Sequence, residues 1–267
     1  MEPSRILFVS TVMEPYLPAS EIATLVRQLS QSIQDKGHEI RTFMPRFGCI
    51  NERRNQLHEV IRLSGMNLII DDTDPPLIIK VATLPSARTQ IYFIDNEDYF
   101  QRRAILHDES GKLFEDNDER SVFFARGVLE TVKKLRWSPD IVHCHGWFTC
   151  LLAIFLKKAY KDDPLFSSSK IVLSLYDEQF TEPLNHNAKQ KLLMEGIKAK
   201  DVEVLSEPIY ENFMKLAIQY SDGLILGSKV VNQSLISYAK GLKKPILAYQ
   251  GEEYISAYNM FYDKIID

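Results

Sequence analysis

The sequence predicts an α/β fold with a single doubly wound, mostly parallel sheet, and two features of the chain indicate it. Short apolar runs rich in β-branched residues recur along the 267 residues, and several lack polar–apolar alternation, as strands buried on both faces do. Helical patterns separate many of these runs, which implies right-handed crossovers between parallel strands. The length suits one large domain, so residues 1–267 are expected to form one unit.

Eight segments are expected to form strands, because each combines apolar and β-branched residues over a short length. In chain order they are residues 5–10, 39–44, 78–84, 90–94, 140–145, 170–175, 223–226 and 245–249. Residues 50–116 interrupt the strand–helix rhythm, since they offer strands and turns, such as the DDTDPP run at 71–76, with few helical repeats. This region is expected to be a β-rich excursion from the main sheet.

The first helix is expected soon after the first strand, with Ser20 placed to cap it and Gly37 placed to end it. Its apolar residues repeat at helical spacing; they are Ile22, Leu25, Val26, Leu29 and Ile33. Further helices are expected over residues 118–135, 148–160, 207–220 and 231–240. Residues 250–267 are expected to form a terminal helix that packs on the chain's own sheet, because their apolar side chains recur at helical intervals.

The composition argues against several classes of protein. A formal net charge of −4 and a pI near 5.9 give no concentrated basic surface for nucleic acid. Three cysteines without a CxxC pair argue against a disulfide framework and favour a reducing cytoplasm. The longest apolar run, around residues 151–156, is far shorter than the ~20 residues of a membrane span, and no signal peptide precedes the first strand. A cytoplasmic protein without a nucleic-acid or membrane partner is expected.

Ligands of open α/β sheets collect beyond the carboxyl ends of the parallel strands. This rule selects the loop 11–20, the end of strand 140–145, and the segments 176–178, 227–229 and 250–252. We expect the functional residues of this chain to lie in these five places.

His143 and His145 are separated by one residue on an expected strand, so their side chains should point the same way. Two interpretations remain open for the pair. A metal site needs a third donor, and none is recognisable by spacing, whereas a core histidine bonded within the fold needs no ligand. His145 is nearer the strand end and can meet a ligand hydroxyl. Trp147 either offers an aromatic face to a sugar or belongs to the core.

Conventional catalytic and cofactor motifs are missing from the sequence. Asp177 with Glu178, and Glu252 with Glu253, are adjacent and therefore diverge, so no carboxylate pair is selected for glycoside hydrolysis. GxSxG, GxGxxG and GxxxxGK[ST] are all absent, which leaves little support for a nucleophile elbow or a standard NAD or ATP site. No cofactor and no metal are expected.

Six stretches, taken in order, resemble the amino-terminal half of bacterial glycogen synthases and plant starch synthases. They are RILFVSTVMEPYL at 5–17, LSQSIQDKGHEIRTFMPRFG at 29–48, IYFIDNEDYFQR at 91–102, FEDNDERSVFFARGVLE at 114–130, PDIVHCHGW at 139–147 and AIQYSDGLILGS at 217–228. The resemblance implies one Rossmann-like half of a GT-B glycosyltransferase. In that family two such domains enclose the site where glucose passes with retention from ADP-glucose to an α-1,4-glucan. The chain is expected to lack the second domain.

The resemblance places a Lys-x-Gly-Gly loop of the family, which lies near the donor phosphates, on residues 18–21. Here the lysine falls on Pro18 and the two glycines fall on Ser20 and Glu21. Bare glycine backbone lets phosphate approach the N–H groups, and lysine offsets the charge of the departing diphosphate. The donor loop is therefore expected to be degenerate and the binding of ADP-glucose to be impaired.

Some of the other positions keep the family pattern, and others depart from it. His145 corresponds to the family histidine that contacts the transferred glucose, and Asp116, Asn117 and Arg120 match residues that cap and brace a helix near the glucan. By contrast, Gly146 stands where the family commonly has aspartate, and Tyr176-Asp177 stand where many members have His-Asn. The candidates for contact with glucan are His145, Trp147, Asp116, Asn117, Arg120, Tyr176 and Asp177. For Asp116, Asn117 and Arg120 a purely structural role is the alternative, because Asp or Asn at a helix N-cap needs no ligand.

Two classes of function follow. The chain is either a glucosyltransferase of this type, or one half of such an enzyme completed by a partner chain that carries the other domain, or it is a non-catalytic protein. A non-catalytic protein would bind glucan or a maltooligosaccharide or have a regulatory role. The altered donor loop favours an isolated chain without transferase activity.

Overall fold

A computed structural model describes residues 3–84 and 89–267, and its centre is a ten-stranded sheet. The strands are β1 (Arg5–Ser10), β2 (Glu39–Pro45), β3 (His58–Glu59), β4 (Met66–Asn67), β5 (Pro76–Leu84), β6 (Thr89–Asp95), β7 (Ile141–His145), β8 (Lys170–Leu175), β9 (Gly223–Leu226) and β10 (Ile246–Leu247). Their order is β10-β9-β8-β7-β1-β2-β6-β5-β3, with β4 paired to β5. The strands from β10 to β6 pair in parallel, which confirms the predicted fold class.

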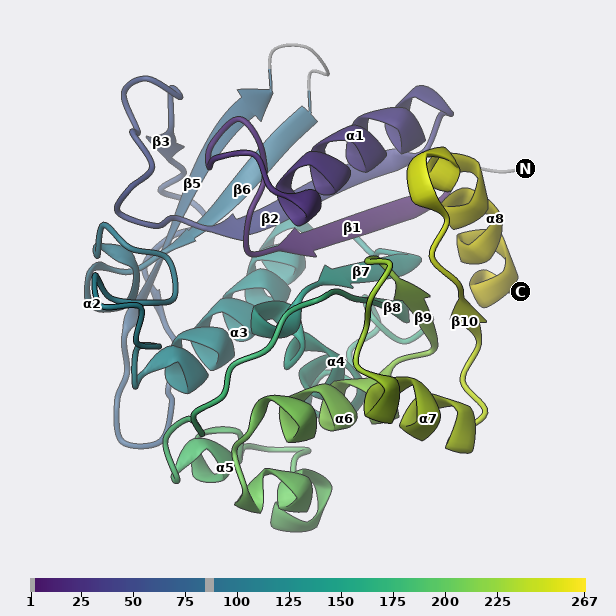
Figure 1. Ribbon diagram of the computed structural model, residues 1–267. Helices are drawn as coiled ribbons and strands as arrows, with labels where there is room; N and C mark the ends of the chain where they lie inside the picture. Colours follow the sequence, from purple (N-terminus) through teal and green to yellow (C-terminus); the bar gives the residue numbers. More distant parts are fainter. Residues whose placement is uncertain (1–2, 85–88) are drawn as a thin grey trace.

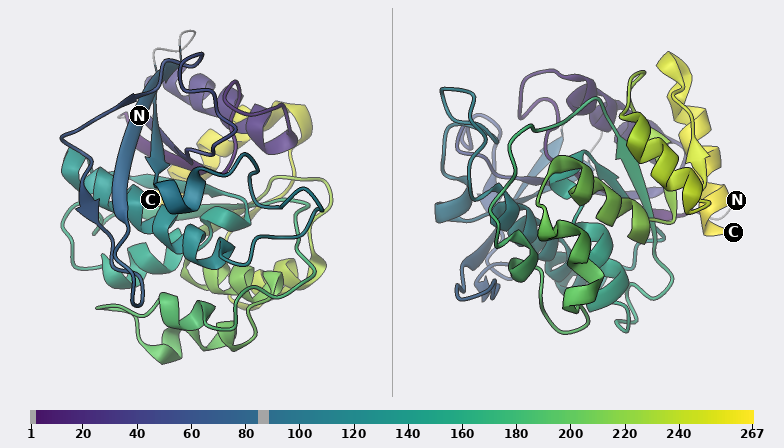
Figure 2. Two further views of the ribbon diagram at one scale, coloured as in Figure 1. Left: turned by 90° about the vertical axis from the view of Figure 1, so that its left-hand side faces the viewer. Right: turned by 60° about the horizontal axis from the view of Figure 1, so that its bottom comes forward.

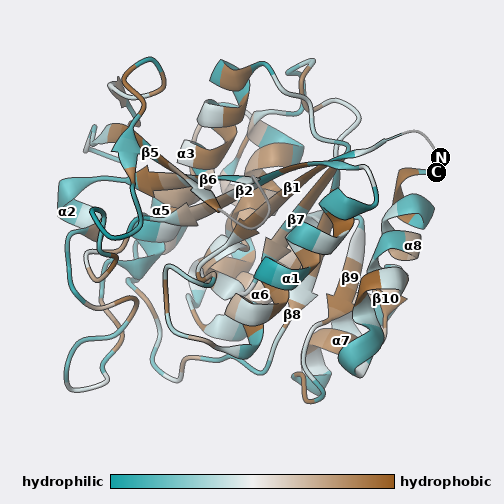
Figure 3. Cartoon of the chain, turned by 90° about the horizontal axis from the view of Figure 1, so that it is seen from above, coloured by the Kyte–Doolittle hydropathy of each residue, from teal (hydrophilic) through white to brown (hydrophobic). Residues whose placement is uncertain are grey.

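Helices cover both faces of this sheet (Figure 1). The α-helices are α1 (Glu21–Asp35), α2 (Glu97–Phe100), α3 (Asn117–Leu135), α4 (Leu152–Ile154), α5 (Ala188–Lys191), α6 (Tyr210–Tyr220), α7 (Gln233–Gly241) and α8 (Tyr254–Ile266). The 3-10 helices are η1 (Trp147–Thr149), η3 (Ala199–Ser206) and η4 (Gly251–Glu253), and η2 (Phe155–Ala159) is a π-helix. Helices α1 and α8 lie on one face, whereas α3, α4 and α6 lie on the other (Figure 1). Apolar residues concentrate along the strands between these layers (Figure 3).

Helix α1 forms where its periodicity predicts. The Ser20 hydroxyl accepts a hydrogen bond from the backbone N–H of Ala23, 3.2 Å away, and so caps the first turn. Gly37 adopts a φ of +97° just beyond the last turn, a left-handed conformation that suits glycine. The apolar side of α1 is buried, so local sequence signals and burial agree over this helix.

Residues 50–116 are rich in strands, and these strands continue the sheet instead of leaving it. β6 pairs in parallel with β2. Its residues Ile91–Ile94 are all buried, as expected for an internal strand of the sheet. β5 then pairs with β6 in the antiparallel sense, and β3 and β4 follow at that edge. Figure 2 shows this edge opposite α8.

The segment after β7 departs from the single helix predicted over residues 148–160. It runs through a 3-10 turn (η1), a short α-helix (α4) and a π-turn (η2). Gly196 lies against the end of this segment, so close that a Cβ there would stand 2.5 Å from the carbonyl oxygen of Lys158. No helix in the described part of the chain is long and apolar enough to cross a membrane.

Candidate functional site

His145 ends strand β7 and is the central polar residue of the candidate site. It pairs in register with Ser10 of β1 and Ser174 of β8, so three polar residues meet where three parallel strands end. Its Nδ1 lies 2.7 Å from the hydroxyl oxygen of Tyr176, whereas its buried Nε2 has no hydrogen-bond partner among the described residues. A buried polar atom without a partner is unusual in a folded protein and indicates a place for a ligand or a water molecule.

Burial lowers the pKa of His145 to about 3, so its imidazole is neutral at physiological pH. A neutral imidazole donates from one nitrogen and accepts at the other. When the Tyr176 hydroxyl donates to Nδ1, the proton of the ring resides on Nε2. Nε2 is then an uncharged hydrogen-bond donor, but His145 is 0% exposed, so this atom is not open to a ligand from solvent in this structure.

His143 has a different role from His145, although both side chains point the same way, with ring centroids 3.9 Å apart. Its Nδ1 lies 2.7 Å from the hydroxyl oxygen of Tyr262 on α8, and its Nε2 lies 2.7 Å from the hydroxyl oxygen of Ser174. Both ring nitrogens are occupied within the fold, so His143 is a structural residue that joins β7 to β8 and α8. The two histidines therefore do not offer a pair of free metal-binding nitrogens.

Trp147 does not present its ring to solvent. The side chain is 5% exposed, and its ring packs edge-on against Phe180, with centroids 4.9 Å apart, and against Phe148. Trp147 contributes its backbone instead, because its N–H donates to Glu178 Oε2 at 3.0 Å. The core interpretation of this tryptophan is the one that the geometry supports.

The carboxylate of Glu178 fills a space beside Gly146. A Cβ on Gly146 would lie 2.9 and 3.0 Å from the two carboxylate oxygens, and Gly146 has a φ of +81° that disfavours other residues. Burial raises the pKa of Glu178 to about 7. A carboxyl group thus stands next to the position where the family commonly has aspartate, but it comes from the loop after β8. Segment 176–178 is one of the five places expected to hold functional residues, but the sequence indicates only that the Glu178 carboxylate diverges from that of Asp177 and does not predict this role.

Residues 14–21 place a carboxylate where the family resemblance places phosphate-binding glycines. Glu21 is the first residue of α1, and its Oε2 accepts a hydrogen bond of 2.6 Å from the Ser228 hydroxyl. Ser228 Oγ in turn accepts the backbone N–H of Asp177 at 3.1 Å. Glu21 therefore links the start of α1 to the segments after β8 and β9, while Pro18 and Ser20 lie exposed beside it. The carboxylate also lies at the positive end of the α1 dipole.

Asp116, Asn117 and Arg120 brace the loop before α3. Asp116 takes the N-cap position but makes no side-chain capping bond; its carboxylate instead pairs with Arg102 at 2.7 and 2.5 Å, which corrects the predicted capping role. Asn117 donates to the carbonyl of Leu106 at 2.8 Å. Arg120 is 0% exposed and donates to the carbonyl of Tyr99 at 2.8 Å and to Asn117 Oδ1 at 2.5 Å. Asn117 and Arg120 bond backbone carbonyls, whereas Asp116 bonds the side chain of Arg102.

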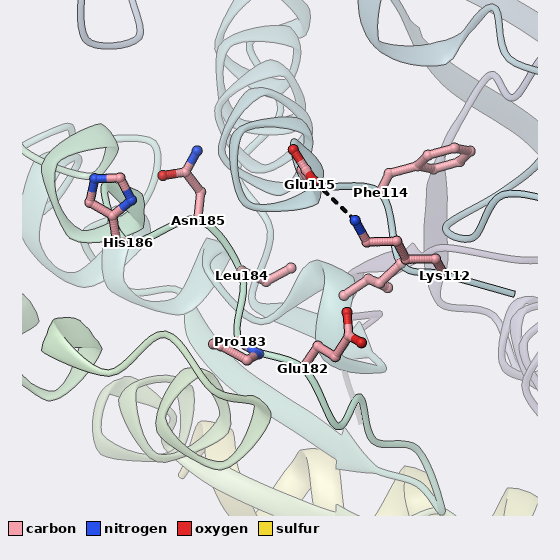
Figure 4. Close-up of a pocket in the computed structure, with 9 residues that line it drawn as sticks. Lys112, Phe114, Glu115, Glu182, Pro183, Leu184, Asn185 and His186 are labelled. Atoms are coloured by element: carbon pink, nitrogen blue, oxygen red, sulfur yellow. Dashed lines mark hydrogen bonds and ion pairs between the residues drawn. The ribbon is translucent and has the colours of Figure 1, made fainter.

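A groove runs between residues 107–115 and 179–186, and no sequence motif predicts it. It consists of two adjoining hollows of about 380 and 370 Å³ that share Lys112, Leu113 and Glu182. Figure 4 shows Lys112 paired with Glu115, while Glu182, Asn185 and His186 come from the facing segment. Phe180 lines the second hollow and packs on Trp147, so the groove lies beside the turn that follows His145.

Comparison with known proteins identifies relatives of this architecture. A family model described as "Starch synthase catalytic domain" matches residues 5–246. The glycogen synthase of Chlorobium limicola (strain DSM 245 / NBRC 103803 / 6330) is 37% identical over 196 residues, which are 73% of this chain and 40% of the relative. That of Pelodictyon phaeoclathratiforme (strain DSM 5477 / BU-1) is 33% identical over 233 residues, which are 87% and 47%. The chain thus spans less than half the length of these relatives.

A solved structure has the same fold. It is titled "Catalytic domain of Starch Synthase IV from Arabidopsis thaliana bound to ADP and acarbose" and superposes with a TM-score of 0.72 at 18% identity. The superposition covers 93% of this chain and 51% of the plant chain. These findings confirm the resemblance to glycogen and starch synthases, as well as the predicted likeness to one half of a GT-B glycosyltransferase.

Proposed function

Because the chain belongs to the starch synthase catalytic domain family, we propose that it is a glucan-binding domain of that family which does not by itself transfer glucose from a sugar nucleotide. The observation that carries the proposal is the position of Glu21, whose carboxylate is held by Ser228 at the start of α1. A donor diphosphate would need this place to be positive and open. The chain keeps the fold of the family, but the loop that faces the donor phosphates in that family is altered at residues 18–21.

The electrostatic argument follows from the charge at this position. A phosphate charge about 5 Å from Glu21 would be repelled by roughly 3 kcal/mol at an effective dielectric constant near 20. Residues 14–29 contain neither lysine nor glycine, so this segment supplies no bare backbone, and its one cation, Arg27, lies six positions beyond Glu21 within α1. These features oppose the binding of ADP-glucose and of any departing diphosphate.

The proposed binding of glucan rests on the groove. The groove lining combines charged, amide and imidazole side chains with apolar surface, and Lys112 is already paired with Glu115 at 3.0 Å. Such a lining offers donors and acceptors without a strong net charge, which suits a neutral polyhydroxylated chain. The free Nε2 of His145 favours a second candidate function, namely one half of a glucosyltransferase whose donor side comes from another chain or chain segment.

The first prediction concerns transfer and binding by the purified chain. We expect retention on a glycogen column, saturable binding of maltoheptaose by calorimetry, and no incorporation of radiolabelled glucose from ADP-glucose into glycogen. Incorporation by the chain alone, or saturable binding of ADP-glucose, would contradict the proposal. Incorporation that appears only after addition of a cell extract would support the two-component enzyme.

The second prediction concerns the groove. Glu182→Gln removes an exposed carboxylate from its lining and is expected to weaken the binding of maltoheptaose by about threefold to tenfold, since hydrogen bonds to charged groups are worth up to about 1.5–3 kcal/mol. Asp35→Asn, at the far end of α1, removes an exposed carboxylate outside the groove and should leave the affinity unchanged. Equal affinities of Glu182→Gln and Asp35→Asn for maltoheptaose would show that the glucan binds outside the groove.

A further inference from the structure

One wall of the groove contains an extended segment, residues 178–183, that is held to the rest of the fold at few points. Just before it, the N–H of Asp177 donates to the Ser228 hydroxyl at 3.1 Å, and just after it, the N–H of Leu184 donates to the carbonyl of Pro208 at 2.9 Å. Between these anchors, no backbone group of the segment makes a hydrogen bond with any other described residue. Side chains must therefore fix the position of this wall.

Two side chains of the segment hold it against the turn that follows β7. Glu178 Oε2 accepts the N–H of Trp147 at 3.0 Å, and the carboxylate fills the space that a Cβ on Gly146 would need. Phe180 packs edge-on against the rings of Trp147 and Tyr210, with centroids 4.9 and 5.6 Å away, and it lines the second hollow of the groove. The wall therefore stays in place as long as Glu178 and Phe180 keep their contacts with Trp147.

The surroundings of the Glu178 carboxyl favour its neutral form. Burial raises its pKa to about 7, the Trp147 N–H acts in the opposite direction, and no lysine, arginine or histidine of the described chain contributes. The titratable groups that face it are Cys150 after η1, Tyr176 after β8 and Tyr210 at the start of α6. Burial raises the pKa of each of these three groups, so all three are neutral when Glu178 titrates. Glu178 keeps partial exposure, which lets its proton exchange with water.

Ionisation of Glu178 favours a released wall. An unpaired carboxylate is costly to keep out of water, and outward movement of residues 178–183 would hydrate it. That movement would separate Phe180 from Trp147 and displace the groove lining that follows. The closed wall thus holds the proton of Glu178 more tightly than the released wall does. Its advantage is present below about pH 7 and is lost as the pH rises through that value.

We propose that Glu178 is a positioning residue of the groove, which holds the wall at residues 178–183 closed on Trp147 while its carboxyl is protonated and releases the wall when the carboxyl ionises. The inference rests on the proposed glucan-binding function and adds regulation by pH to the same groove. Glu178 acts through Trp147 and Phe180 and does not touch the glucan. The affinity for glucan therefore falls as the pH rises, and binding near neutral pH takes up part of a proton.

The test is a calorimetric titration with maltoheptaose at pH 6, 7 and 8, in two buffers of different ionisation enthalpy. The affinity of the parent chain is expected to fall by about threefold to tenfold from pH 6 to pH 8, with proton uptake near pH 7. Glu178→Gln cannot ionise and should bind as tightly at pH 8 as at pH 6. The amide signals of Gly146, Trp147 and residues 178–183 should shift between pH 6 and pH 8 in the parent and stay in place in Glu178→Gln.

Two control variants separate Glu178 from other titrating groups. Glu207→Gln makes the same chemical change at an exposed carboxylate outside the groove lining, so it should keep the pH dependence of the parent. His107 and His186 line the groove, and imidazole side chains as a class titrate in this pH range. The double variant His107→Gln with His186→Gln should keep the ratio of affinities between pH 6 and pH 8, even if both affinities are lower.

Several results would overturn the inference, and they can be told apart. An affinity of the parent that does not change from pH 6 to pH 8, or a fall that persists in Glu178→Gln, would overturn the role of Glu178 and leave the proposed function standing. Loss of the pH dependence in the double histidine variant would assign it to the imidazoles instead. An absence of maltoheptaose binding at every pH would overturn the proposed function as well.

Discussion

Replacement of Arg120 by alanine is expected to lower the free energy of unfolding by about 3–5 kcal/mol, as judged by urea denaturation. The guanidinium is fully buried and bonds the carbonyl of Tyr99 and the amide oxygen of Asn117. Its carbon also lies 5.4–5.9 Å from the centroids of four rings, those of Phe47, Phe100, Phe114 and Phe148. Alanine would leave a cavity among these rings and an unpaired carbonyl.

The control for this substitution is Arg103→Ala, because Arg103 is exposed and lies in the loop before α3. That variant should change the unfolding free energy by no more than about 0.5 kcal/mol. Arg120→Ala should also weaken maltoheptaose binding, since Asn117, which Arg120 holds, anchors Leu106 immediately before the groove wall 107–115. If Arg120→Ala lowers the free energy of unfolding by less than about 1 kcal/mol, the buried guanidinium does not stabilise the fold as proposed.

A pH-dependent stability centred on Glu178 is the second large effect expected. Burial raises the pKa of this carboxyl to about 7 in the folded protein, from an ordinary value of 4.5. The folded state then holds the proton more tightly than the unfolded state does. The resulting stabilisation is complete below about pH 4.5 and is lost as the pH rises through about 7, with a total of up to about 3 kcal/mol.

The variant Glu178→Gln isolates this effect. Glutamine keeps an oxygen that can accept the N–H of Trp147 but cannot ionise, so the variant should lack this component of the pH dependence. The quantity to measure is the unfolding free energy of the parent minus that of the variant, between pH 5 and pH 8. It should fall by about 2–3 kcal/mol, whereas the same difference for the exposed Glu182→Gln should stay flat. A flat difference for Glu178→Gln would show that the carboxyl is ionised throughout.

The parts of the fold that the sequence predicts are those set by local signals. Helix α1 has its cap, its period and its terminating glycine within 18 residues, and β7 has alternation that places His143 and His145 on one side. Ordered motifs across the chain then predict the family, which the match over residues 5–246 confirms. Both kinds of signal are carried by short stretches of sequence.

The features of the structure that the sequence does not predict depend on contacts between residues far apart in the chain. Glu178 reaches Gly146 from another strand end, and Asp116 bonds Arg102 in place of the helix terminus. The segment after β7 has a helical pattern, yet it is divided into 3-10, α and π turns. The groove has no motif, because it is assembled from loops whose meeting is set by the sheet order.

The bond between His143 and Tyr262 ties the biosynthesis of the site to the last helix of this sequence. Strand β7 is translated more than a hundred residues before Tyr262, as the separation of 119 positions records. Until Tyr262 leaves the ribosome, one nitrogen of the buried imidazole lacks its native partner and the sheet face under α8 stays uncovered. This surface is thus exposed while the residues between are synthesised, and transiently exposed apolar surface is what makes folding intermediates prone to aggregate.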